Sequence, residues 1–244
     1  MLLALTQGKA GRIGNEIKAG SSWREVFKSS EDLLTAAVFG RLVYLRGSRL
    51  WSILRNAFGS ALPDYKLVEL VDASFWPTWP ENEGGTKTVE PDVFLQFNVG
   101  DPAVRIDVIV EAKYRPGYDQ YAEQWQRQWT AYHRFVAQDD GASAFLLAIG
   151  GLGPHAATTM HRLQGQLRAD GLDVKVVAAN WPKLLDAVTA EIEIAKSEER
   201  RLLGDILEAM ALAGFRKIRQ LEDLYSQRRL NPASKSAFLD YDYR

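Results

Sequence analysis

Two carboxylates and one amine lie at the ends of neighbouring apolar segments of this chain. Asp92 opens "PDVFLQFNV", and Glu111 and Lys113 close "VRIDVIVEAKY". If the two carboxylates face each other they repel, and a counter-charge is needed. Lys113 supplies part of it, and a divalent cation would supply more, because carboxylate oxygens suit Mg²⁺ or Mn²⁺. The residue types therefore predict a site for a hard divalent cation.

The spacing of the two segments decides whether these groups meet. Both segments predict β-strands, and "GDPA" between them predicts a hairpin turn. Side chains two residues apart share a face, so Glu111 and Lys113 point the same way, while Ala112 adds a main-chain carbonyl. Facing residues then have numbers that sum to about 203, which places Asp92 opposite Glu111 with Cβ atoms roughly 4.5–5.5 Å apart. A register slip of one residue would separate them.

The elements that must position these groups follow from the hydrophobic pattern. Ser29 or Ser30 is the expected N-cap of the first helix, with acidic residues in its first turn. Helices are expected at 29–45, 51–58, 118–138, 155–170 and from 181 to about 229, and strands at 66–76, 142–150 and 172–179 in addition to the hairpin. Helix, three strands, helix, strand, helix, strand predicts an α/β fold in which helices flank a mixed β-sheet.

The pattern "PD", eighteen residues, then "EAK" resembles the signature of the PD-(D/E)xK nuclease superfamily, whose fold is restriction-endonuclease-like. The element order of that superfamily matches residues 31–150, about half of the chain. Its members often carry an acid on the helix before the first strand, a position that Glu31 matches. They also carry a glutamine on the helix after the hairpin, matched by Gln124, and Gln128 with Tyr132 fits the variant Gln-x-x-x-Tyr.

The resemblance implies a Mg²⁺-dependent nuclease that hydrolyses phosphodiester bonds in DNA, with Mn²⁺ as a substitute and restriction or genome defence as the setting. It implies that Asp92, Glu111 and the main-chain carbonyl of Ala112 hold the metal, and that Glu31 contacts a second metal or a metal-bound water. Lys113 would position or help deprotonate the attacking water and offset charge in the transition state. Gln124 would hold a phosphate or orient Lys113. Duplex cutting would favour a homodimer, because each site hydrolyses one strand.

Other interpretations remain open. The fold would also suit a protein that binds nucleic acid or a partner without cleaving it, and the hairpin charges would also suit an ordinary surface ion pair. "GLGPHA", with Gly151 and Gly153 before a predicted helix, approximates a phosphate-binding loop. Asp32, Glu69 and Asp72 are rival acids for the role of Glu31.

Composition limits the classes of protein that fit. The chain has 244 residues, no cysteine, 46% hydrophobic and 25% charged residues, and a net charge of −1. These values predict a cytoplasmic globular protein without disulfides or a membrane span, and they give no global basic surface. We expect a lead-in at 1–27, a nuclease-like domain at 28–180 and a C-terminal helical region with a tail at 181–244.

Overall fold

The computed structural model describes Phe27 and residues 30–114, 119–137 and 142–217; most of the expected lead-in and tail lie outside these ranges. The helices are α3 (Glu31–Leu42), α4 (Gly47–Phe58), α5 (Ala122–Ala131), α6 (Ala156–Ala169), α7 (Trp181–Ile194) and α8 (Ser197–Leu212), with a π-helical turn at Tyr132–Val136. The strands are β1 (Val68–Phe75), β2 (Trp79–Pro80), β3 (Thr88–Val89), β4 (Val93–Val99), β5 (Val104–Ala112), β6 (Ser143–Ile149) and β7 (Val176–Ala179).

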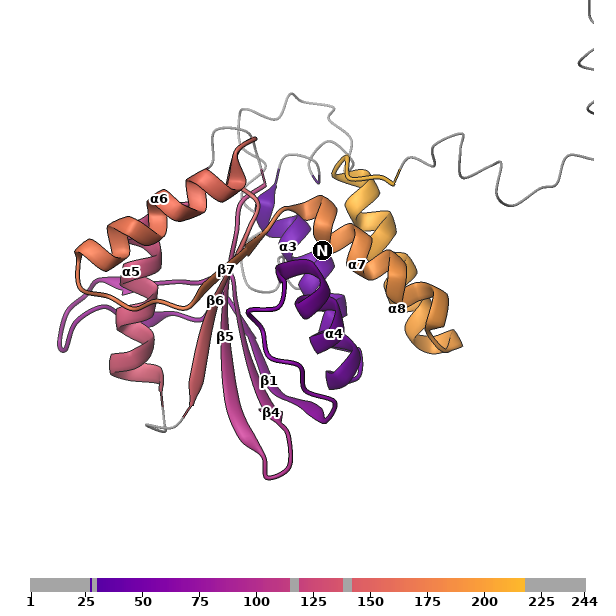
Figure 1. Ribbon diagram of the computed structural model, residues 1–244, viewed down its shortest axis with the longest axis horizontal. Coiled ribbons are helices and arrows are strands. Elements are labelled where there is room, and N and C mark those ends of the chain that lie inside the picture. Colours follow the sequence, from indigo (N-terminus) through magenta and orange to yellow (C-terminus); the bar gives the residue numbers. More distant parts are fainter. Residues whose placement is uncertain (1–26, 28–29, 115–118, 138–141, 218–244) are drawn as a thin grey trace, which may run out of the picture.

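One mixed sheet organises the molecule, with strand order β1-β4-β5-β6-β7. Strand β4 runs antiparallel to both of its neighbours, β1 and β5, and β5, β6 and β7 run parallel to one another. Figure 1 shows α5 and α6 on one face of the sheet, and α3, α4, α7 and α8 on the other. The expected α/β fold, a mixed sheet flanked by helices, is confirmed.

The β4–β5 hairpin has the register that the sequence predicts. Val93 pairs with Val110, and the ladder continues without a shift to the turn. Asp92 and Glu111 occupy the next position beyond this ladder, where the N–H of Asp92 donates to the carbonyl of Val110 at 3.1 Å. Leu95 belongs to the apolar cluster on the α3 side, so the residues that alternate with it, Asp92 among them, belong to the α5 side.

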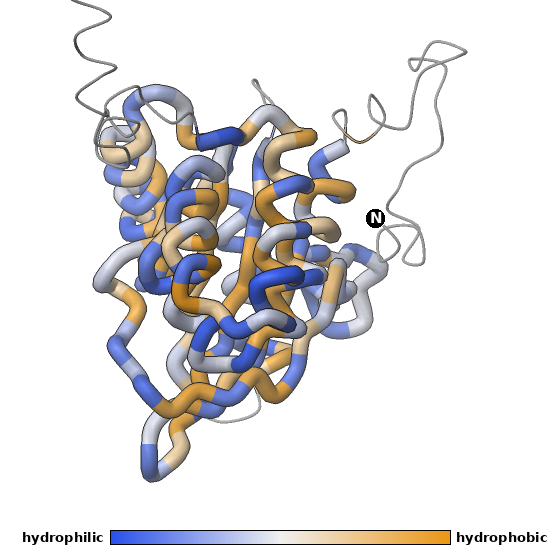
Figure 2. Tube along the Cα trace, turned by 90° about the vertical axis from the view of Figure 1, so that its right-hand side faces the viewer, coloured by the Kyte–Doolittle hydropathy of each residue, from blue (hydrophilic) through white to orange (hydrophobic). Residues whose placement is uncertain are grey.

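Two apolar clusters fill the space on either side of the sheet. The larger joins the sheet to α4, α7 and α8, and the smaller joins it to α5 and α6. Figure 2 shows hydrophobic and hydrophilic residues alternating along the helices, as expected for elements with one buried face. The helices at 181–212 thus share a core with the sheet that carries the candidate site.

Several element boundaries differ from those expected. Helix α4 begins at Gly47 rather than residue 51. Gly47 lies against β1, where a Cβ atom would come within 2.5 Å of the Val68 carbonyl oxygen. Helix α5 begins at Ala122 rather than residue 118, after Gln120 turns inward. Between the strand expected at 66–76 and the hairpin, the structure adds the short β2–β3 pair, whose strands are too brief to give a sequence pattern.

Candidate active site

Four charged side chains converge at the C-terminal end of β5. The Nζ of Lys113 donates a hydrogen bond to Oε1 of Glu111. Asp92 precedes β4, and its Oδ2 accepts the N–H of Ala112 at 2.7 Å. Glu31, in the first turn of α3, places its Oε1 3.7 Å from Nζ of Lys113. Three carboxylates and one ammonium group thus come together from three segments that are distant in sequence.

Glutamine amides from α5 and the segment before it hold Glu111. The Nε2 of Gln124 donates to Oε1 of Glu111 at 2.7 Å, and the Nε2 of Gln128 donates to Oε2 at 2.6 Å. The Nε2 of Gln120 donates to the main-chain carbonyl of Glu111 at 3.1 Å, while its Oε1 accepts the indole N–H of Trp125 at 2.8 Å. The buried Oε1 of Gln128 has no hydrogen-bond partner among the described residues. These contacts fix the Glu111 carboxylate from two sides.

Burial and neighbouring charges set the protonation of the cluster. Burial, followed by the charge of Glu111, raises the pKa of Asp92 well above its ordinary value. Burial also raises the pKa of Glu31, although Lys113 opposes this change. Burial would lower the pKa of Lys113, but the carboxylates of Glu111, Glu31 and Asp92 together outweigh it, and the pKa lies above its ordinary value. Lys113 therefore stays an ammonium group, while burial favours the protonated forms of Asp92 and Glu31.

The main chain at Lys113 is held by groups from other elements. The indole N–H of Trp181, at the start of α7, donates to the Lys113 carbonyl at 3.0 Å. The N–H of Tyr114 donates to Oε2 of Glu31 at 2.7 Å. Gly150 follows β6 with φ of +71°, and a Cβ atom there would lie 1.9 Å from the Lys113 carbonyl oxygen. Position 150 therefore requires glycine so that Lys113 can reach the site.

The donor set fits a hard divalent cation by atom type and charge. Asp92, Glu111 and Glu31 offer carboxylate oxygens, the Ala112 peptide lies beside them, and three carboxylates exceed the one ammonium group of Lys113. In the described ranges no three His, Cys, Asp or Glu side chains are already arranged to hold a metal ion. Both oxygens of Glu111 accept hydrogen bonds, so a cation there requires these contacts to rearrange.

Some expected positions lie away from the cluster. Tyr132, the second residue of the Gln-x-x-x-Tyr pattern, donates its hydroxyl to Oδ2 of Asp107 at 2.9 Å instead. The rival acids Glu69 and Asp72 lie at exposed positions of β1. The glycine turn before α6 has positive φ at Gly151 and Gly153. The carbonyl of Gly151 accepts the main-chain N–H of Gln120, so this turn holds the segment before α5.

Two residues that hold the site were missed by sequence reasoning. Gln120 falls within the helix expected at 118–138, and nothing in "YDQY" signals that its side chain is buried. For Trp181 the sequence predicts only the start of a helix. Here a signal existed, because Asn180 as N-cap and Pro182 in the first turn fix the helix start.

Comparisons with known proteins identify distant similarity. No protein-family model matches the chain. An uncharacterized protein of Pasteurella multocida (strain Pm70) is 26% identical over 226 residues, which cover 88% of this chain and 81% of that protein. Among solved structures, the MspJI restriction endonuclease in complex with a 27-mer oligonucleotide aligns with a TM-score of 0.31 and 14% identity. That alignment covers 85% of this chain and 42% of the endonuclease chain.

In the described part of the chain, none of the helices combines the length and the apolar character that crossing a bilayer requires.

Proposed function

We propose that this protein is a metal-dependent nuclease that hydrolyses phosphodiester bonds in DNA, with Mg²⁺ as its cation and Mn²⁺ as a substitute. The observation that carries the proposal is the cluster of Glu31, Asp92, Glu111 and Lys113, in which Glu111 is only 1% exposed. Burying carboxylates side by side costs free energy, and perturbed groups of this kind gather at functional sites. The superfamily spacing in the sequence coincides with this cluster, which supports the same activity.

The residues would divide the work as follows. Asp92 and Glu111 would hold the cation, with the Ala112 carbonyl and Glu31 completing the protein ligands. A bound divalent cation would lower the pKa of water and stabilise negative charge on phosphate oxygens. Lys113, kept as an ammonium group by its carboxylate neighbours, would orient the attacking water and offset charge on the phosphoryl oxygens.

Glutamine contacts would tune this arrangement. In the structure Gln124 donates to Glu111 rather than to Lys113, so its first role is to fix the orientation of the carboxylate. Gln124 would have its amide available for a phosphate once Glu111 turns toward a cation. The superfamily resemblance implies restriction or genome defence as the biological setting, and in that setting the substrate would be DNA.

A cleavage assay tests the proposal. Purified protein is incubated with single-stranded and duplex DNA in Mg²⁺ or Mn²⁺, and products are separated on a gel. We expect cleavage by the wild type and a loss of at least roughly 100-fold in Glu111→Gln and Lys113→Ala, because the first weakens the hold on the cation and the second removes the ammonium group that would orient the attacking water. Lys183→Ala, at an exposed position of α7, is the matched control and should cleave normally.

Circular dichroism of each variant separates loss of chemistry from loss of fold. A wild-type protein that cuts neither form of DNA with either cation would contradict the proposal. If that protein still bound DNA, a nuclease fold that binds without cleavage would be the better description. Full activity in folded Lys113→Ala would refute the assigned role of the ammonium group.

A further inference from the structure

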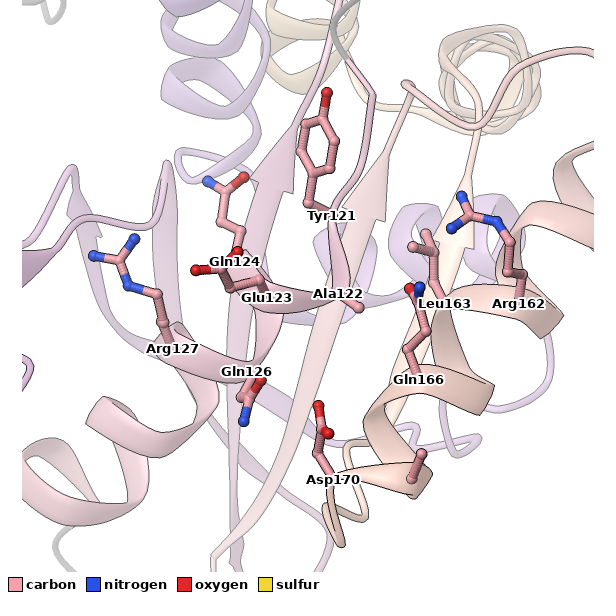
Figure 3. Close-up of a pocket in the computed structure, with 11 residues that line it drawn as sticks. Tyr121, Ala122, Glu123, Gln124, Gln126, Arg127, Arg162, Leu163, Gln166 and Asp170 are labelled. Atoms are coloured by element: carbon pink, nitrogen blue, oxygen red, sulfur yellow. The ribbon is translucent and has the colours of Figure 1, made fainter.

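A pocket of about 810 Å³ lies between α5 and α6, on the face of the sheet that carries Glu111. Figure 3 shows side chains from both helices around it. Those that matter here come from α5 and its N-cap, and from α6 and its C-cap: Tyr121, Gln124, Arg127, Arg162, Gln166 and Asp170. Its volume falls within the range of small-ligand sites, roughly 300–1,000 Å³.

The pocket adjoins the charged cluster. Gln124 lines the pocket, and its Nε2 donates to Oε1 of Glu111 at 2.7 Å. One side chain therefore separates the pocket from the carboxylate. A ligand that reacts beside Glu111 and also fills the pocket must be long enough to extend from the carboxylate into the pocket, as a polymer such as a nucleic-acid strand does.

The lining combines an aromatic face with mixed polar groups. Tyr121 is 57% exposed and presents its ring to solvent at the rim. The positive charges of Arg127 and Arg162 are balanced by the negative charges of Glu123 and Asp170. The guanidinium group of Arg127 also donates a hydrogen bond to Oε1 of Glu81 at 2.7 Å. A pocket with balanced charge does not select a bare anion. Amides, carboxylates and guanidinium groups next to a ring suit a nucleobase, which offers a flat face and both donors and acceptors.

We propose that the pocket between α5 and α6 binds an unpaired nucleotide of the substrate, next to the phosphate at the Glu111–Lys113 cluster. This inference rests on the proposed nuclease function and assigns single-stranded DNA, or a strand opened at the site, as its substrate. Bases within a duplex are stacked and paired, so they do not enter a pocket between two helices unless they leave the stack.

Binding of fluorescently labelled oligonucleotides in EDTA tests the inference without hydrolysis. Fluorescence anisotropy gives the affinity of the full chain for a short single strand and for a hairpin duplex. Tyr121→Ala and Arg162→Ala should each weaken single-strand binding about tenfold, because stacking on a ring and an arginine contact are typically worth that much. Duplex binding should not change.

Matched controls come from the same chain. Tyr44→Ala removes a ring that is 77% exposed at the end of α3, and Arg168→Ala removes an exposed guanidinium group of α6 that does not line the pocket. Both should bind like the wild type. Equal losses for the single strand and the duplex, or pocket variants that bind like these controls, would overturn the inference.

The cleavage assay keeps the two proposals apart. A chain that needs Tyr121 and Arg162 for single-strand binding but never cuts DNA supports the pocket and overturns the nuclease function. A chain that cuts in a Lys113-dependent way yet binds single strands equally well without these side chains overturns only the pocket.

Discussion

Asp92→Asn removes one negative charge from the candidate site and preserves its shape. The side-chain oxygen of asparagine still accepts the N–H of Ala112, a contact of 2.7 Å in the structure. Asp92 is 8% exposed, and its pKa is raised by burial first and by Glu111 second. In metal-free solution at neutral pH, we therefore expect the variant to unfold at a higher temperature than the wild type.

The size of the effect follows from the hairpin register. Asp92 and Glu111 lie one position beyond the Val93–Val110 pair, and two unit charges separated by roughly 5 Å, the Cβ spacing of facing residues, would repel by about 3 kcal/mol at an effective dielectric constant of ~20. The substitution also loses attraction to Lys113, which brings the expected gain to about 1–3 kcal/mol. For a chain of this size that corresponds to roughly 3–10 °C in Tm.

The gain should depend on pH with a defined sign. The folded-state pKa of Asp92 exceeds the ordinary value of about 3.8, so its contribution to stability is present below that value and is lost as the pH rises through the folded-state pKa. Urea unfolding in EDTA should show little difference between variant and wild type near pH ~4 and a growing advantage of the variant toward pH ~9.

Asp186→Asn, at an exposed position of α7, is the matched control and should change stability by less than about 0.5 kcal/mol. The reasoning is refuted if Asp92→Asn destabilises the protein by the same amount at every pH. That outcome would mean that the Asp92 carboxylate does not destabilise the fold through repulsion by Glu111.

Two further changes test the scaffold around the site. Gly150→Ala should lower the free energy of unfolding by on the order of 3 kcal/mol, because the added Cβ would collide with the Lys113 carbonyl oxygen. Gly153→Ala has a similar positive φ but open space around it, so it should cost only about 1 kcal/mol of backbone strain. Thermal unfolding compares the two variants. Tyr132→Phe removes the hydroxyl that donates to Asp107 and should cost about 1.5–3 kcal/mol in urea unfolding. A neutral result for Gly150→Ala, or for Tyr132→Phe, would show that the neighbouring backbone or water compensates.

The hairpin was predictable from sequence because its period and its turn are local. Val93 and Val110 face each other as the spacing requires, and Asp92 and Glu111 follow from the same register. The N-cap of α3 was also predictable, since the hydroxyl of Ser30 accepts the N–H of Leu33 as capping rules expect.

The residues that support the charged cluster, Gln120 and Trp181, were not predictable, because their contacts join positions that are distant in sequence. Gln120 reaches Glu111 only because α5 starts later than its pattern indicates. Trp181 contacts Lys113 across the sheet, through the space that Gly150 leaves. A single sequence gives no distance between such positions.

The sequence pattern of α5 also predicts only part of its role in the site. Its glutamines and aromatic residues recur at helical spacing, which predicts one buried face but not which amide meets a carboxylate. The end of α5 then changes to a π-helical turn beginning at Tyr132, which directs that hydroxyl to Asp107.

Anomalous diffraction from crystals soaked in Mn²⁺ tests the central claim most directly. The account predicts a Mn²⁺ peak bonded to carboxylate oxygens of Asp92 and Glu111 at about 2.0–2.4 Å, with the Gln124 amide displaced from Glu111. A saturating soak that leaves no peak at these two carboxylates, with their present hydrogen bonds intact, would contradict it.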